Sequence, residues 1–386
     1  MLKIDFMPFH SLDTIIDFLD PVFLLQNRED DGLRKNQWGN SVQIYSDSFP
    51  DIEQVDIIFL GCGESRGDVG GTFSNDAPNA VRKAFYPLYQ WHEEVQMADV
   101  GNIKKGATIQ DTYVALQTVI SELLKHGKRV VILGGSHDLT IPQYEVYARE
   151  EKIIEMVNVD AKINIDMEHP APAENFLMKV LTSEPNFVRH YNHIGFQSYY
   201  VHPGMLETID KLRFDCYRLG KVKENIEEME PVIRNAAMLS FDISALAYSY
   251  APANRFSPNG FNGEEACMLM QYAGMSPELT TLGIYGFNAD EDLHGLTAKQ
   301  ISQMLWYYID GIEKSKQESA LGNFTEFNEY KIAFSEMESL FIQSKRTGRW
   351  WMKMPNGRFI ACSHHDYLLS TQNEIPERWL RAMERD

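Results

Sequence analysis

The sequence predicts an open, doubly wound α/β fold, in which a mostly parallel sheet lies between two layers of helices. Short apolar runs alternate with amphipathic helical stretches through the middle of the chain. Several of these apolar runs are continuous, which is typical of strands buried on both faces of a parallel sheet. Hydrophobic residues make up 44% of the 386 residues, enough for a sizeable core.

Seven segments are expected to form strands because each is a short, mostly apolar run. In chain order they are residues 55–60, 95–100, 129–133, 153–159, 193–196, 238–241 and 282–287. Helices are expected where apolar residues recur at spacings of three and four. In chain order these are residues 78–89, 109–126, 141–150, 204–212, 263–272 and 298–314.

At the two ends of the chain, predicted strands and helices no longer alternate. We therefore predict a central α/β domain at residues 51–320, an N-terminal extension at 1–50 and a C-terminal extension at 321–386. The first extension contains a helical pattern at residues 12–19.

The C-terminal extension contains an Asn356–Gly357 pair between two apolar arms, which predicts a β-hairpin at residues 349–362. A short amphipathic helix is expected at residues 376–383. Because a lone hairpin is marginally stable in water, we expect this hairpin to pack on the core, to extend the main sheet or to build a subunit interface.

Charge and composition exclude several classes of protein. The net charge is −19, from 55 acidic and 36 basic residues, so neither nucleic acid nor an anionic membrane is expected as a partner. No apolar run is long enough to span a membrane, and the first residues lack the pattern of a secretory signal. The four cysteines are scattered, which favours a reducing compartment, and we expect a cytoplasmic protein.

Polar residues follow three of the predicted strands where each one ends. Residues 134–138 read GGSHD, residues 160–166 read DAKINID, and residues 240–244 read SFDIS. Ligands of open α/β sheets bind at the carboxyl ends of the strands. These segments therefore predict a site that joins His137, Asp160 and Asp242.

These segments resemble the ureohydrolase family of arginase, agmatinase and formimidoylglutamase, whose motifs are GGDHS, DAHxD and SxDxD. Further matches in family order lie at residues 63–82, 99–102, 193–196 and 288–298. The resemblance covers about residues 55–315 and implies an arginase-like, three-layer fold. It also implies a pair of manganese ions held by two histidines and four aspartates.

Three of the six implied ligands are replaced. His137, Asp160 and Asp242 are kept, whereas Lys162, Asn164 and Ser244 stand where the family has His, Asp and Asp. The resemblance thus implies one residual metal site, formed by His137, Asp160, Asn164 and Asp242. A protonated lysine has no lone pair to give to a metal. We expect Lys162 to lie beside Asp160 and Asp242 as a counter-charge, in place of the second metal.

Two other departures concern substrate binding. Gly286 stands where the family has a substrate-binding Glu. Asp166 is the candidate substrate-binding residue, at the position where arginase holds a carboxylate with Asn.

These departures lead us to expect a catalytically impaired family member, with no cofactor or a single weakly bound Mn²⁺. The alternative is an active hydrolase of an amidine or guanidine C–N bond with a one-metal or rearranged site. Asp160, Asp242 and His137 are its candidate catalytic residues. A small-molecule ligand at the carboxyl edge and a homo-oligomer are also expected.

Overall fold

The computed structural model describes residues 12–23, 32–69, 76–166, 168–254, 256–334 and 337–385. The remainder of the predicted N-terminal extension, and part of the glycine-rich match at 63–82, lie outside these residues.

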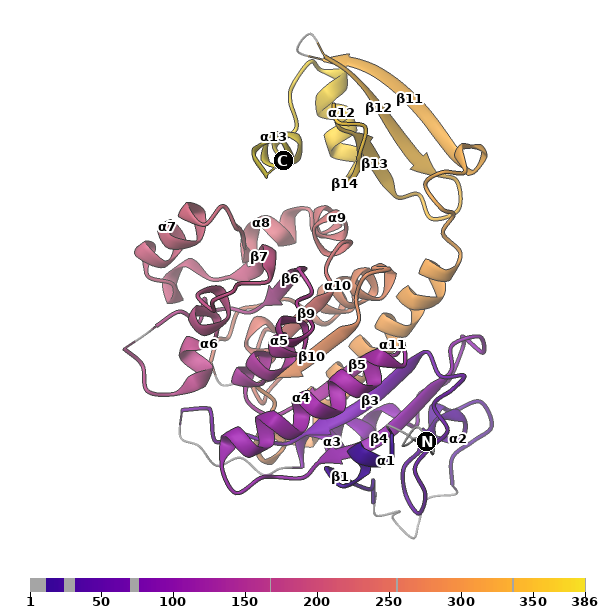
Figure 1. Ribbon diagram of the computed structural model, residues 1–386, viewed down its shortest axis with the longest axis vertical. Coiled ribbons are helices and arrows are strands. Elements are labelled where there is room, and N and C mark those ends of the chain that lie inside the picture. The colour runs from indigo at the N-terminus through magenta and orange to yellow at the C-terminus, as the bar shows by residue number, and fades with distance from the viewer. Residues whose placement is uncertain are drawn as a thin grey trace, which may run out of the picture.

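The described residues form a ten-stranded main sheet with the order β1-β4-β3-β5-β10-β9-β6-β7-β8, and β2 also pairs with β4 (Figure 1). The pairs are parallel except for β1 with β4. The strands are β1 (Leu19–Asp20), β2 (Gln43–Ile44), β3 (Ile57–Cys62), β4 (Met97–Ile103), β5 (Arg129–Gly134), β6 (Ile154–Val159), β7 (Val188–Phe196), β8 (Asp215–Arg218), β9 (Met238–Asp242) and β10 (Thr281–Tyr285). This arrangement confirms the predicted fold class.

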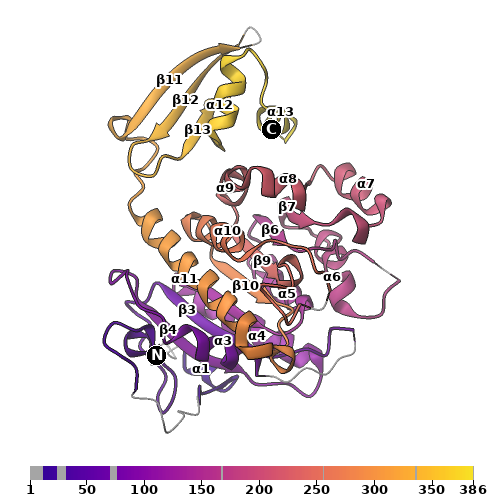
Figure 2. The same ribbon diagram turned by 180° about the vertical axis from the view of Figure 1, so that it is seen from behind.

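Helices cover both faces of the main sheet (Figures 1 and 2). Alternate residues of a strand point to opposite faces, so Ile57 and Phe59 of β3 enter one core and Ile58 and Leu60 enter the other. The first face is covered by α3 (Ala77–Phe85), α8 (Leu219–Glu224), α9 (Met229–Ile233), α10 (Gly263–Met275) and α11 (Leu296–Lys316). The second is covered by α1 (Asp13–Ile16), α4 (Ile109–Lys125), α5 (Thr140–Arg149), α6 (Pro172–Leu181) and α7 (Pro203–Lys211).

All seven predicted strands and all six predicted helices of the central region are present, with shifts at their ends. The sequence did not predict β8, a four-residue strand that begins with an acidic residue. It also did not predict α6, whose apolar residues Phe176, Leu177 and Val180 are buried against the sheet. At the N-terminal end, α1 is shorter than the helix expected at residues 12–19, and α2 (Trp38–Ser41) precedes β2.

The C-terminal residues form a second sheet with the order β11-β12-β13-β14. The predicted hairpin is present as β13 and β14. Its strand β13 pairs with β12, which pairs in turn with β11, so the hairpin does not extend the main sheet. The unit lies beside the ends of α8 and α9 and follows α11 (Figure 1). Its elements are β11 (Phe327–Phe334), β12 (Met337–Ser344), β13 (Trp350–Lys353), β14 (Phe359–Cys362), α12 (His364–Thr371) and α13 (Glu377–Arg385).

Buried polar contacts attach this C-terminal unit to the main domain. Arg234, at the end of α9, donates a 2.7 Å hydrogen bond to the carbonyl oxygen of Trp350. Arg349 donates to the carbonyl oxygen of Met275 at 3.0 Å, at the end of α10. The hairpin therefore packs on the main domain, at the segments that lead into β9 and β10.

Among the described helices, none combines the length and the apolar character that crossing a membrane would need.

Candidate functional site

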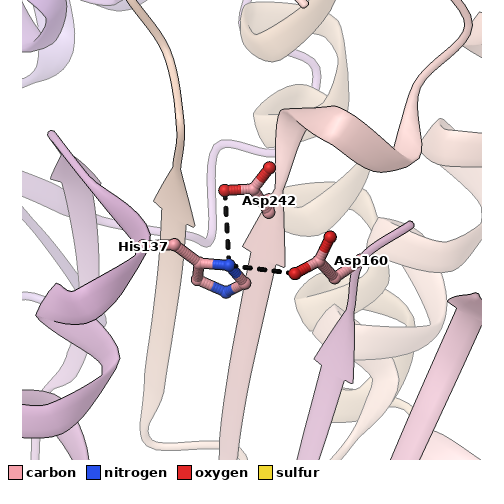
Figure 3. Close-up of side chains that lie close together, drawn as sticks. All are labelled: His137, Asp160 and Asp242. Carbon is pink, nitrogen blue, oxygen red and sulfur yellow. Dashed lines mark ion pairs between the residues drawn. The ribbon is translucent and has the colours of Figure 1, made fainter. Parts of the chain in front are cut away.

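Three strand ends bring the predicted site together at the carboxyl edge of the main sheet. His137 follows β5, Asp160 follows β6, and Asp242 ends β9. Strands β5, β10, β9 and β6 are neighbours in the sheet, so these ends lie side by side. Figure 3 shows the three side chains converging, as predicted.

The imidazole of His137 lies between the two carboxylates. Its Nδ1 is 3.1 Å from Oδ2 of Asp160 and 3.4 Å from Oδ2 of Asp242 (Figure 3). Its Nε2 lies 2.9 Å from Oγ of Ser240 and 3.2 Å from Oδ1 of Asn158. These contacts on both nitrogens fix the ring, and its Nδ1 is aimed at the acids.

Burial and neighbouring charge shift the pKa of each of these three groups in opposite directions. Burial alone would lower the pKa of His137, but the charges of Asp242 and Asp160 raise it. Burial alone would raise the pKa of Asp160, but His137 lowers it to about 2. Burial raises the pKa of Asp242 to about 6, with the charge of His137 opposing that rise. His137, rather than a lysine, is thus the counter-charge between the two acids.

Asn164 lies beside this cluster, with its Nδ2 3.4 Å from Nδ1 of His137, and adds an amide to the possible ligands of one divalent cation. The same Nδ2 donates to the carbonyl oxygen of Ala173 at 2.9 Å, while the buried Oδ1 has no hydrogen-bond partner among the described residues. An unpaired buried amide oxygen costs free energy unless a cation or a donor meets it. One imidazole nitrogen, two carboxylates and one amide oxygen match the ligands of first-row divalent metals. The residues therefore fit the first metal of the family.

The structure differs from our prediction for Lys162. The Lys162 ammonium forms its ion pair with Glu174 on α6, not with Asp160 or Asp242. It also lies over the ring of Phe256, 4.8 Å from the ring centre. Burial alone would lower the pKa of Lys162, but the charges of Glu174 and Asp160 raise it. The difference arises because the flexible stem of Lys162 carries its charge to α6, while Ser244 bonds to Asp160.

Ser244 occupies the remaining side of the site. Its hydroxyl donates to Oδ1 of Asp160 at 2.6 Å, and its backbone N–H donates to Oδ1 of Asp242 at 2.8 Å. A hydroxyl and a protonated lysine do not replace a carboxylate and an imidazole as metal ligands. The residues therefore do not fit the second metal of the family.

Gly286 follows β10 and lies directly against Asp242. Its φ is +76°, and a Cβ built on it would be 2.5 Å from Oδ2 of Asp242. A side chain at this position would therefore meet both backbone strain and a clash. The backbone here is shaped for glycine, so the substrate-binding Glu implied by the resemblance has no place.

Asp166, the candidate substrate-binding residue, is exposed in the loop after β6. Its carboxylate accepts a 3.1 Å hydrogen bond from the backbone N–H of Glu168. The structure therefore places Asp166 in a turn, outside the cluster of His137, Asp160 and Asp242.

The sequence analysis missed three residues that shape the site: Asn158, Glu174 and Ser240. Asn158 and Ser240 are polar residues inside otherwise apolar strands, and such a break in an apolar run is a signal that points to them. Glu174 gave no comparable signal, because its role depends on how α6 packs beside residue 162.

A family model described as the arginase family matches residues 55–309. An agmatinase from Blochmanniella floridana is 25% identical over 245 residues, which cover 59% of this chain and 78% of that protein. A formimidoylglutamase from Staphylococcus haemolyticus is 23% identical over 131 residues, or 33% of this chain and 40% of that protein. The match thus spans less than half the length of that formimidoylglutamase.

Solved structures show the same fold. The structure of Trypanosoma cruzi formiminoglutamase with Mn²⁺ has a TM-score of 0.62 and 17% identity, and the match covers 69% of this chain and 96% of that chain. The formimidoylglutamase of Bacillus subtilis has a TM-score of 0.65 and 16% identity, covering 75% of this chain and 96% of that chain. At this level of identity the likeness shows the fold alone.

Proposed function

Since this chain belongs to the arginase family, we propose that it is a member that has lost two-metal hydrolysis of amidines and guanidines. It retains a site for at most one divalent cation, formed by His137, Asp160, Asn164 and Asp242. The observation that carries this proposal is that Lys162 and Ser244 supply no ligand for a second metal. The Lys162 ammonium is paired with Glu174 on α6, and the Ser244 hydroxyl donates to Asp160.

The charge of the site supports the same conclusion. Asp160 and Asp242 contribute two negative charges, which one divalent ion balances. A second divalent ion would face the Lys162 ammonium and the Ser244 hydroxyl, and neither can offset its charge. In this family a pair of metal ions generates the attacking hydroxide, so a site with one ion has a weaker means of activating water.

Gly286 supports a loss of substrate recognition as well. A carboxylate at this position would hold a cationic substrate group, and both the positive φ and the contact with Asp242 oppose any side chain there. The protein therefore acts by binding a small molecule at the carboxyl edge of the sheet. It does not act as an arginase, agmatinase or formimidoylglutamase at the rates of active members.

One observation favours a second candidate, a hydrolase of linear amidines that uses a single metal. His137, Asp160 and Asp242 offer ligand atoms that lie within 4.8 Å of one another, and the Asn164 amide lies beside His137. A single metal ion can polarise a bound water or a substrate atom. The relatives named formimidoylglutamase and agmatinase set the substrate class of this candidate.

An assay of the full chain with Mn²⁺ separates the two candidates. Arginine, agmatine and N-formimidoylglutamate are supplied, and the release of urea, ammonia and formamide is measured. We expect no turnover above that of the Asp242→Ala variant, prepared in parallel to reveal contaminating enzymes. Turnover by the natural chain that Asp242→Ala abolishes would overturn the proposal and establish the single-metal hydrolase.

A further inference from the structure

A cavity of about 430 Å³ lies at the carboxyl edge of the main sheet, beyond β7 and β8. The turn after β7, the start of α8 and the loop between β9 and α10 form its wall. We call it the tyrosine pocket. It is defined by Tyr199, Arg218, Lys223, Tyr250, Asn259 and Asn262. Its volume is in the range of small-molecule sites in proteins.

The charge of this pocket is opposite to that of the whole chain. Among the described residues that line it, the charged ones are Arg218 and Lys223, both cations, although the chain has a net charge of −19. The Lys223 ammonium donates to Glu265 at 2.7 Å and to the carbonyl oxygen of Gly260 at 3.1 Å. Arg218 is exposed, and its guanidinium meets no acceptor in the described part of the chain. It is the cation that is free to bind an anion.

Two tyrosine rings line the same pocket as Arg218, and both are exposed. Tyr199 is 65% exposed and Tyr250 is 41% exposed. The hydroxyl of Tyr199 donates to Oε1 of Gln197, and its ring lies edge-on to Tyr200 with centroids 4.7 Å apart. Tyr199 is therefore held in place although most of its surface meets solvent. A fixed, exposed ring offers a planar surface for stacking at little cost in conformational entropy.

The wall is also connected to the candidate metal site. The backbone N–H of Gln197 donates to the carbonyl oxygen of Ala161 at 2.9 Å, directly after Asp160. The ring of Tyr200 lies 4.3 Å from that of Phe256, over which the Lys162 ammonium sits. The tyrosine pocket is thus a neighbour of the site, formed by different side chains.

We propose that the tyrosine pocket binds a small organic anion that joins a planar ring to one carboxylate or phosphate group. Arg218 pairs with the anionic group, because a guanidinium binds carboxylate and phosphate oxygens with two parallel hydrogen bonds. Tyr199 and Tyr250 contact the ring. This inference rests on the pocket alone and does not depend on whether the neighbouring site hydrolyses a substrate.

Calorimetric titration of the full chain tests this proposal with two probes, adenosine 5′-monophosphate and indole-3-acetate. We expect at least one of them to bind with a Kd below about 1 mM. Inorganic phosphate and adenosine carry only one half of the required chemistry, so each should bind at least about tenfold more weakly than the nucleotide.

Variants assign the binding to the pocket. Arg218→Gln should raise the Kd of the probe at least about tenfold, because it removes a charge-assisted contact. Tyr199→Ala should raise this Kd as well, with an unchanged circular dichroism spectrum. The matched control is Arg189→Gln, which changes another exposed arginine, one that pairs with Glu155, and should leave the Kd within about twofold.

Three results would overturn the proposal. The first is that neither probe binds. The second is that Arg218→Gln binds as tightly as the natural chain. The third is that phosphate or adenosine binds as tightly as the nucleotide. Equal binding of phosphate would indicate an unspecific anion site, and equal binding of adenosine would indicate an unspecific ring site.

Discussion

Two clusters of buried charged side chains lie at opposite edges of the main sheet, and they differ in how completely they are paired. At the amino edge, the guanidinium carbons of Arg234 and Arg349 lie 4.5 Å and 5.6 Å from the centre of the Trp351 ring. Each guanidinium also has an acidic partner, Glu230 for Arg234 and Glu318 for Arg349. At the carboxyl edge, one imidazole faces two carboxylates, and the Asn164 Oδ1 has no partner within the described part of the chain.

The difference separates a structural role from a binding role. A fully paired cluster leaves nothing for a ligand to satisfy, and it attaches the C-terminal unit to the main domain. An incompletely paired cluster keeps a free energy cost that a bound cation can relieve. Changes at the amino edge should therefore alter stability, and changes at the carboxyl edge should alter binding.

The largest expected effect is at the amino edge. Trp351→Ala removes the ring that Arg234 and Arg349 contact and leaves a cavity, since Trp351 is only 7% exposed. We expect the free energy of unfolding in urea to fall by about 3–5 kcal/mol. Manganese affinity should not change. Trp91→Ala is the matched control, because Trp91 is 77% exposed and its removal should alter neither quantity.

Separate roles for the two edges would be contradicted if Trp351→Ala weakened manganese binding while leaving the unfolding free energy unchanged. The two edges would then be coupled through the sheet, rather than serving separate roles.

The second effect is at the carboxyl edge. Asp242→Asn keeps the shape of the side chain but removes one of the two carboxylate ligands. We expect manganese affinity to fall at least about 100-fold. The unfolding free energy of the metal-free protein should not fall by more than about 1 kcal/mol, since one of two like charges beside His137 is gone. Isothermal titration and urea unfolding measure the two quantities, and an unchanged affinity would remove Asp242 from the site.

The third effect is a gain in manganese affinity. Asn164→Asp gives the residual site a third carboxylate in place of the amide whose Oδ1 lacks a partner. We expect manganese to bind about tenfold more tightly, because an anionic oxygen is a stronger ligand than an amide oxygen. Asn175→Asp, in the neighbouring helix α6, serves as the control for a general gain of negative charge. Equal gains in both variants would contradict a direct role for Asn164.

The smallest effect concerns pH at the amino edge. Burial alone would raise the pKa of Glu318, but hydrogen bonds from Ser344, Thr347 and Arg349 lower it. A lowered pKa means that the carboxylate stabilises the fold above about pH 4.3 and loses this contribution as the pH falls further. At pH 7, Glu318→Gln should therefore cost about 1–2 kcal/mol, and this cost should shrink as the pH falls toward 3. Urea unfolding of both proteins across this range checks the sign, and a cost that grows in acid would contradict it.

Much of the fold could be predicted because its strands are buried on both faces. Continuous apolar runs marked β3 and β5, and the spacing of the predicted strands left room for the crossover helices. The short strand β8 gave no such run. The pairing of the C-terminal hairpin with β12 depends on contacts that no local pattern contains.

The site could be predicted in part for a related reason. Residues that follow parallel strands meet at one edge, so the ends of β5, β6 and β9 were enough to join His137, Asp160 and Asp242. The direction of the Lys162 side chain could not be predicted in this way. Its stem has four rotatable bonds, and its partner Glu174 lies on a helix whose packing the sequence did not reveal.

The central claim is that the carboxyl edge holds one divalent cation and not two. The most direct test is the manganese content per chain, measured after dialysis for the natural protein and for the triple variant Lys162→His, Asn164→Asp, Ser244→Asp. We expect at most one ion in the natural protein and two in the variant, because only the variant supplies ligands for the second metal. Two tightly held ions in the natural protein would contradict it.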